Sequence, residues 1–166
     1  MNSKTKAENY FDDLVSYLFL YLKPLGYKKK GNNFRYYNKE EKWGKIINFQ
    51  KSQWNTKLQI TFTVNVGLYL EDWANEYNEK FLSNTKSVAD NFPIHLCAAQ
   101  GRIGRICDYN RDMWFEVHDL IDYEKLKATL DRDFVQFIIP FLDAIKTKED
   151  VINLPHRLTK DKRDEL

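Results

Sequence analysis

The chain of 166 residues carries 26 Lys plus Arg against 24 Asp plus Glu, and this net charge of +2 argues neither for nor against nucleic acid as a partner. A content of 43% hydrophobic and 15% aromatic residues excludes wholesale disorder, and two cysteines exclude a disulfide framework and suit a reducing compartment. The length predicts a single domain, residues 1–166, able to bury about 70% of its unfolded surface.

The first predicted element is a helix over residues 5–23. Its apolar residues recur at helical spacing and form one wide stripe: Tyr10, Phe11, Leu14, Val15, Leu18, Tyr21 and Leu22. Thr5 and Glu8 have the spacing of a capping box, in which each side chain satisfies a free backbone N–H at the helix start. Pro24 and Gly26 predict where this helix ends.

A basic turn over residues 27–33 and three strands are predicted next. The first strand covers 34–37, and two more lie within 43–70, where apolar and polar residues alternate strictly from Leu58 to Leu68. Alternation with a period of two indicates a strand with one buried and one polar face. Short polar connections predict an antiparallel meander, with the first helix packed across its apolar face.

The second half of the chain has weaker patterns. Residues 71–82 fit a short amphipathic helix, residues 83–93 a loop, and residues 94–97 and 113–117 two strands. An apolar 3–4 spacing over 126–145 predicts a helix that Pro140 kinks or restarts. The predicted fold is therefore α+β, an antiparallel sheet of about five strands with helices packed on one face. Its core is residues 5–146, and residues 147–166 form a charged tail.

Targeting features point to the cytoplasm. The first ten residues contain no apolar segment of secretory length, and no run of about 18 apolar residues occurs. We therefore expect a cytoplasmic protein without membrane contact. The terminal sequence RDEL resembles a retrieval signal of the endoplasmic reticulum, and we interpret it as part of the solvated tail.

The polar faces of the two central strands are the strongest candidate surface. They carry amides and hydroxyls that offer hydrogen-bond donors and acceptors to a ligand or partner: Asn48, Gln50, Ser52, Thr61, Thr63 and Asn65. The alternative is that this face is merely solvated, because antiparallel sheets commonly expose one polar face without any function.

Two basic segments are the candidates for anion binding. Arg102 and Arg105 alternate with Gly101 and Gly104, a pattern that suits a phosphate or carboxylate, although a tight turn with solvated arginines also accounts for it. Lys28, Lys29 and Lys30 adjoin four aromatic residues, so charge and stacking surface coexist there. Three lysines in a nearly neutral chain provide little positive charge for binding nucleic acid. The alternative is that these lysines form a solvated turn without a binding role.

Catalytic and metal patterns are weak. His95, Cys97, Cys107 and His118 are zinc-compatible types, but they lack paired C-x-x-C spacing, so we predict no metal and no cofactor. A Cys97–His95 nucleophile pair on one strand would lie about 6–7 Å apart, too far for direct activation. Four acidic residues lie near Trp114 in the sequence: Asp108, Asp112, Glu116 and Asp119. Paired carboxylates beside a tryptophan would suit a glycosidase, and the simpler alternative is that these side chains are solvated. No catalytic residue is predicted.

Several motifs in order resemble one family. LKPLGYKKKGNNF at 22–34, INFQKS at 47–52, FTVNVGLY at 62–69, RIG at 102–104 and DMWF at 112–115 are similar to domain-of-unknown-function family 4304, a largely bacterial group. Tyr27 and Phe115 depart from the family's usual Phe and Trp, and Ala98 stands where a His is common. The resemblance implies a compact bacterial α+β protein and carries over no catalytic residue. Weak analogy with some relatives adds a role in bacterial conflict or immunity.

The preferred hypothesis from the sequence is a non-catalytic binding protein, of immunity or antitoxin type, that contacts a partner protein through the polar sheet face and the aromatic-rich edge. Trp114 is among the residues that we expect to bind the partner. The first alternative is a nucleic-acid or phosphate binder that uses Lys28 to Lys30 with Arg102 and Arg105. The second is a hydrolase or metal-dependent enzyme around His95, Cys97, Trp114 and His118. The sequence leaves the oligomeric state open.

Overall fold

In the computed structural model of the chain, residues 3–81 and 90–154 are described, and they form an α+β fold around an antiparallel sheet. The strands are β1 (Lys28–Lys30), β2 (Asn33–Asn38), β3 (Trp43–Lys51), β4 (Gln59–Leu70), β5 (Ala99–Arg102) and β6 (Phe115–His118). The α-helices are α1 (Lys6–Leu22), α2 (Glu71–Phe81), α3 (Ile103–Ile106), α4 (Tyr123–Asp133), α5 (Ile139–Ala144) and α6 (Lys148–Ile152). Further helical turns are η1 (Lys23–Leu25) and η2 (Ile94–Leu96), which are 3-10, and η3 (Phe134–Ile138), which is π-helical. The predicted fold class is confirmed.

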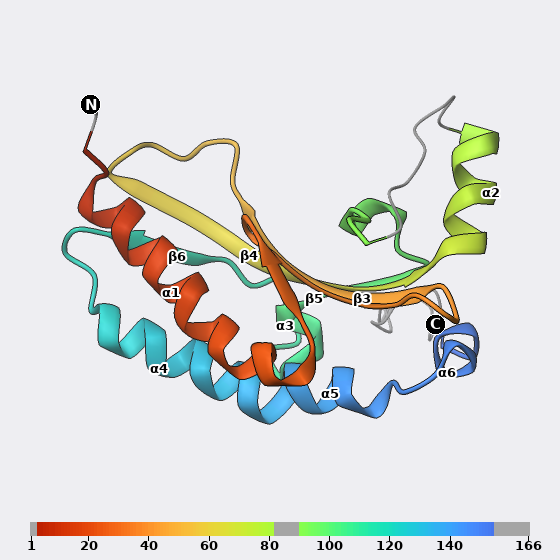
Figure 1. Cartoon of the computed structure of the whole chain (residues 1–166). Helices are drawn as coiled ribbons and strands as arrows, with labels where there is room; N and C mark the ends of the chain where they lie inside the picture. The colour runs from red at the N-terminus through yellow and green to blue at the C-terminus, as the bar shows by residue number, and fades with distance from the viewer. Residues whose placement is uncertain (1–2, 82–89, 155–166) are drawn as a thin grey trace, which may run out of the picture.

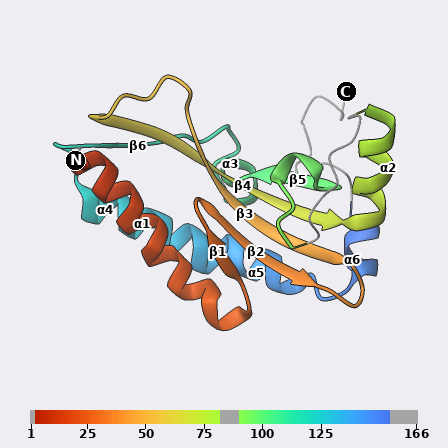
Figure 2. The same ribbon diagram turned by 45° about the horizontal axis from the view of Figure 1, so that its top comes forward.

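Strand β4 is the centre of the sheet. It pairs with β3 along one edge, while β5 and β6 share its other edge, β5 at residues 65–68 and β6 at residues 59–62. Within the described residues the strand order is β1-β2-β3-β4-β5, with β6 beside β4, and every pairing is antiparallel. The predicted meander is therefore present as β2, β3 and β4 (Figure 1; Figure 2).

Helices α1, α4 and α5 cover one face of the sheet (Figure 1). This face carries the apolar half of the alternating pattern, from Ile60 to Leu68 in β4, and these residues belong to the main core. Phe11 of α1 meets Phe62 edge-on with ring centroids 5.1 Å apart, and Phe134 stacks on Phe49 at 6.0 Å. Such aromatic pairs add to the burial of apolar area that holds the two layers together.

The ends of α1 follow the predicted signals. Thr5 and Glu8 form the reciprocal capping box, and Lys6 is the first helical residue. After η1 the chain turns at Gly26, whose φ of +88° is a left-handed conformation that glycine adopts without a Cβ penalty.

The opposite face of the sheet is covered at one end only. A second apolar cluster sits there and joins β3 and β4 to α2 and to residues 92–97: Ile46, Tyr69, Ala74, Phe92, Leu96 and Cys97. Phe92 stacks on Tyr69 with centroids 4.2 Å apart. A Cβ at Gly67 would lie 2.5 Å from Ile94 Cδ1 and 2.7 Å from Cys97 Sγ, so glycine lets this segment approach the strand. We call this end, with Ile46, Gly67 and Tyr69, the covered half.

Some sequence expectations were wrong. The three lysines of the predicted basic turn form edge strand β1, and only Gly31 (φ +58°) and Asn32 turn the chain. Residues 94–97 are not a strand, because η2 leads into β5 two residues further on. Leu58 precedes β4 and is 64% exposed, although the alternation placed it on the buried side.

The predicted C-terminal helix changes its geometry just before Pro140. Helix α4 passes into the π-helical turn η3, and Pro140 lies in the first turn of α5, where its missing N–H is tolerated. Beyond Ile145, Thr147 and Asp150 form a capping box for α6, and Val151 is buried in the core. The RDEL terminus and most of the predicted 83–93 loop lie outside the described residues. None of the described helices is long and apolar enough to cross a membrane.

Candidate partner-binding face

A row of polar residues crosses the sheet on the face opposite α1. The register pairs Lys30 with Asn33, Asn33 with Asn48, Asn48 with Asn65, and Asn65 with Arg102. Residues paired in this way lie on the same face, so one side chain from each of β1 to β5 stands in line. We call these five residues the amide row. Three carboxamides occupy its middle, and a cation occupies each end.

The carboxamides of the amide row are hydrogen-bonded to one another. Asn48 Nδ2 donates to Asn33 Oδ1 at 2.7 Å, and Asn65 Nδ2 donates to Asn48 Oδ1 at 3.1 Å. Asn65 Nδ2 also donates to Gln50 Oε1 at 2.9 Å. These bonds fix the orientation of each amide, and they leave the Nε2 group of Gln50 and the Oδ1 atom of Asn65 without a further partner in the described part of the chain.

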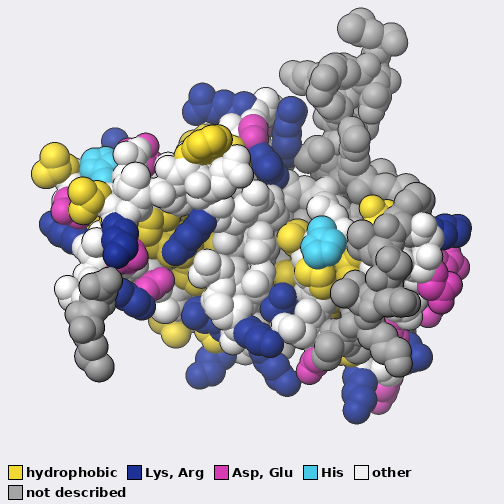
Figure 3. All heavy atoms as spheres, turned by 90° about the horizontal axis from the view of Figure 1, so that it is seen from above, with side chains coloured by type: hydrophobic (Ala, Val, Ile, Leu, Met, Phe, Trp, Pro, Cys, Tyr) yellow, Lys and Arg dark blue, Asp and Glu magenta, His cyan; other side chains and the backbone are white. Residues whose placement is uncertain are grey.

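The row and its neighbours form a surface that the described helices do not cover. Gln50 is exposed, Asn33, Asn48 and Arg102 are half-buried, and Asn65 is buried beneath them. Figure 3 looks onto this face and shows a broad area of neutral polar side chains and backbone, with lysine and arginine side chains around its edges. We call the region the open half of the face; its side chains are Asn33, Asn48, Gln50, Thr61, Asn65 and Arg102.

Arg102 is held in place at one end of the row. Its guanidinium lies 5.3 Å from the ring centroid of Trp114, and Nη1 donates to Asp112 Oδ2 at 2.5 Å. Trp114 Nε1 donates to the same oxygen at 3.1 Å, and its side chain remains partly exposed. Burial raises the pKa of Asp112, but the hydrogen bonds from Arg102 and Trp114 outweigh it and hold that pKa below its ordinary value. The carboxylate is therefore charged near neutral pH.

Other predicted site residues lie away from the open half or are engaged in the fold. Thr63 is fully buried, and its Oγ1 donates to Met113 O at 2.8 Å, so we remove it from the surface. Ser52 follows β3 in a turn, where its Oγ accepts from Trp54 N. Arg105 is exposed on α3, so the GRIGR segment is the end of a strand and one helical turn, not a turn between strands. A Cβ at Gly104 would lie 2.0 Å from Arg111 O, which accounts for that glycine.

The lysine run divides between the two faces of the sheet. Lys28 pairs with Arg35 and Lys30 with Asn33, both on the face of the amide row, whereas Lys29 pairs with Phe34 on the opposite face. The sequence analysis did not identify Asn33 as a residue of this face. It also did not place Lys30 in one row with Asn33 and Asn48. The available signal was the two-residue turn at Gly31 and Asn32, which sets the register of β1 on β2.

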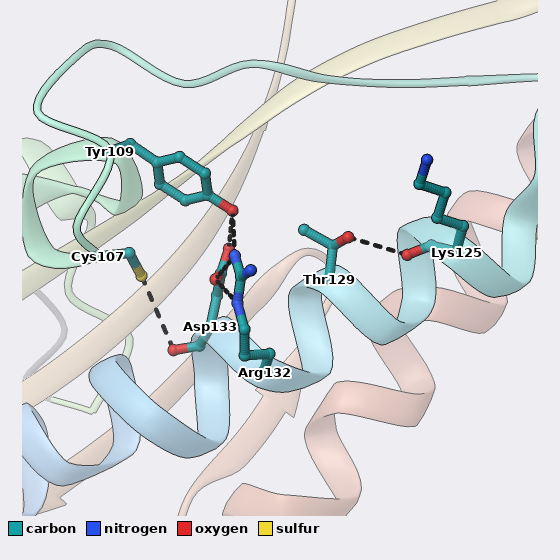
Figure 4. A network of polar contacts seen from close by, with 6 residues as sticks. All are labelled: Cys107, Tyr109, Lys125, Thr129, Arg132 and Asp133. Carbon is teal, nitrogen blue, oxygen red and sulfur yellow. Dashed lines mark hydrogen bonds and ion pairs between the residues drawn. The ribbon is translucent and has the colours of Figure 1, made fainter.

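A second polar cluster surrounds Asp133 at the end of α4 (Figure 4). Its carboxylate is fully buried, receives two hydrogen bonds from Arg132, and accepts one from the Tyr109 hydroxyl at 2.7 Å. The Cys107 thiol donates to the backbone oxygen of Asp133. Burial and Asp133 raise the pKa of Cys107 to about 12, so this thiol is not a ready nucleophile. We interpret the cluster as a link between the segment after α3 and the helix.

The residues of the zinc hypothesis are far apart in the fold. Cys97 belongs to the covered half and Cys107 to the main core on the other side of the sheet. Over residues 3–81 and 90–154, no group of three or more His, Cys, Asp and Glu residues is arranged to hold a metal ion. Two of the four acidic residues near Trp114 have separate partners, since Asp112 pairs with Arg102 and Glu116 lies 3.6 Å from His118.

Comparison with protein families gives one match, to a domain of unknown function, DUF4304, over residues 20–144. The matched segment includes all strands of the sheet and the amide row. Comparison with curated proteins and with solved structures gives no match.

Proposed function

The chain belongs to the domain-of-unknown-function family DUF4304, and we propose that it is a non-catalytic binding protein whose open half engages a partner protein. One observation carries the proposal: side chains from five strands stand in register as a row of amides with a cation at each end. A merely solvated face needs no such alignment, whereas a row of oriented donors and acceptors suits recognition of a polar, partly acidic surface.

Preorganisation of the row supports this role. Binding is weakened when side chains lose rotamer freedom on association, and the Asn33–Asn48–Asn65 bonds fix these side chains beforehand. Arg102 is fixed in the same way by Asp112 and Trp114. Arginine and tryptophan are the residue types most enriched among those that dominate binding energy at protein interfaces.

A protein partner fits this face better than nucleic acid does. Sheets that bind single-stranded RNA stack bases on exposed aromatic rings along their strands, whereas the strands here present amides, a hydroxyl, Lys30 and Arg102. The partly exposed ring of Trp114 lies before β6 and beside Arg102. The carboxylates of Asp112 and Glu116 lie close to Arg102 and along β6, where they oppose a phosphate backbone. Lys28 and Lys30 supply the opposite charge at the other edge, so nucleic acid is the second outcome that the experiment must distinguish.

We also propose a cellular compartment and a kind of binding role for the protein. Cys97 and Cys107 are buried free thiols on opposite sides of the sheet, which suits a reducing compartment, and we place the protein in a bacterial cytoplasm. An immunity or antitoxin role, in which the chain covers a functional surface of its partner, is the binding type that we propose.

Affinity capture from the native cells tests the proposal. One lysate is divided into a nuclease-treated and an untreated sample, and the tagged chain is used as bait in each. Two variants are used in the same way. Gln50→Arg places bulk and charge on the open half, and Ser16→Arg places them on the exposed side of α1. We expect the unmodified chain to retain one protein from both lysate samples. Gln50→Arg should lose that protein, and Ser16→Arg should keep it. Enrichment that disappears with nuclease, or equal capture by both variants, would overturn the proposal.

A further inference from the structure

A pocket opens on the helix-covered side of the sheet, away from the amide row. Its volume is about 230 Å³, and it lies between the end of α1, strands β2 and β3, and the end of α5. Its lining includes the apolar side chains of Trp43 and Leu142 and the polar side chains of Tyr27, Tyr36, Lys45 and Asp143. Nothing in the proposed partner binding uses this pocket.

Lys45 is the central charge of the pocket. It stands on β3 in phase with the buried Trp43 and Ile47, and it is itself only 8% exposed. Its Nζ donates to Leu142 O at 2.6 Å, a carbonyl in the last turn of α5 that also accepts from Ile145 N. An ammonium group carries three N–H donors, and the described residues supply this one acceptor. The remaining donors are available to a ligand.

Tyr27 is the second polar group that could contact a ligand in the pocket. Its side chain is 6% exposed, and its hydroxyl makes no hydrogen bond within the described residues. Burial, with smaller contributions from Asp143 and Tyr36, raises the pKa of this phenol, so it is a neutral donor at any physiological pH. As a lining residue of the pocket, Tyr27 can donate this hydrogen bond to water or to a ligand.

The charge balance of the pocket selects the sign of a ligand. Lys45 and Lys146 face one carboxylate, Asp143, whose Oδ1 lies 3.8 Å from Lys146 Nζ at the exposed mouth. The rings that would attract a cation are already occupied, since Lys45 Nζ lies 5.3 Å from the ring centroid of Tyr36 and 5.6 Å from that of Trp43. Burial, and to a smaller extent Lys146, lower the pKa of Lys45 despite the opposing effects of Asp143 and Asp150, and a bound anion would stabilise this charge.

We propose that this pocket binds a small organic carboxylate, whose oxygens accept hydrogen bonds from Lys45 and Tyr27 and whose apolar body packs against Trp43 and Leu142. The volume is below the range of about 300–1,000 Å³ that is typical of drug-sized ligands, so a ligand of one ring or a short chain fits.

An NMR titration of the ¹⁵N-labelled chain tests this assignment with three probes of similar size: benzoate, its near-isostere benzamide, which is neutral, and benzylamine, which is cationic. We expect benzoate to bind with a Kd of about 1 mM or tighter, and to shift the Trp43 indole signal and the amides of residues 142–146. Benzamide should bind at least tenfold more weakly. No benzoate shift at this site, or equal binding of benzamide or benzylamine, would overturn the proposal.

Two variants separate ligand contacts from folding. Tyr27→Phe removes a hydroxyl that no described residue uses, so thermal stability should stay unchanged while benzoate affinity falls about tenfold. Lys45→Met keeps the apolar stem and should abolish binding, and Lys39→Met, an exposed lysine between β2 and β3, is its control. Unchanged benzoate affinity in Tyr27→Phe would remove the hydroxyl from the site and contradict the proposal even if Lys45→Met failed to fold. Because the pocket and the open half lie on opposite faces, failure of one leaves the other standing.

Discussion

The covered half and the open half are the same face of the same strands, yet residues 92–97 and α2 cover the first, and none of the described helices covers the second. On β3, Ile46 lies beneath the segment of residues 92–97, and Asn48, two residues further, stands in the amide row. On β4, Gly67 lies against Ile94 and Cys97 of that segment, whereas Asn65, two residues away, is buried beneath the amides that it bonds. The comparison shows that the residue type at alternate positions decides which part of a sheet face the chain covers with its own elements.

The difference has a thermodynamic basis. Ile46 and Tyr69 gain stability only when another apolar surface removes them from water, which residues 92–97 provide. The amides of the open half hydrogen-bond to one another and to water, so they need no cover. What remains uncovered is therefore polar, oriented and available to a partner.

The largest expected effect comes from truncation in the covered half. Ile46→Ala removes a fully buried side chain and should lower the free energy of unfolding by about 2–5 kcal/mol in urea denaturation. Asn48→Ala, on the same strand and face, is the matched control and should cost at most about 1 kcal/mol. Equal losses in the two variants would mean that the halves do not differ as described.

Filling the gap above Gly67 should have the next largest effect. In Gly67→Ala the new methyl group would meet Ile94 Cδ1 at 2.5 Å and Cys97 Sγ at 2.7 Å. Such overpacking costs about 1–3 kcal/mol, and the strain falls on the segment that covers the sheet. Hydrogen exchange should become faster in residues 94–97 and remain unchanged in α1. Unaltered exchange and melting temperature would show that this segment is not held against β4.

Removing the middle of the amide row should have a smaller effect on stability. Asn65→Ala removes the hydrogen bonds to Asn48 and Gln50, whose oxygens can then bind water. We expect a loss of about 0.5–1.5 kcal/mol in the free energy of unfolding, with complete loss of partner capture. If Asn65→Ala still captures the partner undiminished, the amide row does not take part in partner binding.

Acidification should act least, and only at the Arg102 end of the row. The pKa of Asp112 is lower in the folded chain than in the unfolded chain, so its contribution to stability is full above the unfolded value of about 3.9 and is lost as pH falls through the lower folded value. For this exposed pair the loss is at most about 1 kcal/mol. The Trp114 indole N–H signal should shift between about pH 5 and pH 2. In Asp112→Asn that shift should be absent; its persistence would contradict the assignment.

Local patterns in the sequence predicted much of the fold. Thr5, Glu8 and Gly26 predicted both ends of α1, and the alternation from Ile60 to Leu68 predicted the central strand and its buried face. These signals act between neighbouring residues, so a single sequence contains them in full.

Features that depend on distant contacts were not predictable in this way. The cover over Gly67 rests on contacts with residues 94 and 97, and the place of Lys30 in the amide row rests on the register of β1. The pocket did leave one signal, because Lys45 is a lysine in phase with Trp43, Ile47 and Phe49 on the buried side of a strand. A charged residue in such a position requires a partner or a function.

Site-specific photo-cross-linking in the native cells tests the central claim most directly. A benzophenone amino acid replaces Gln50 in the open half or, as a control, Ser16 on the exposed side of α1. The account predicts that position 50 cross-links to one protein and that position 16 does not. Cross-links to the same protein from position 16 alone, or only to nucleic acid from position 50, would contradict it.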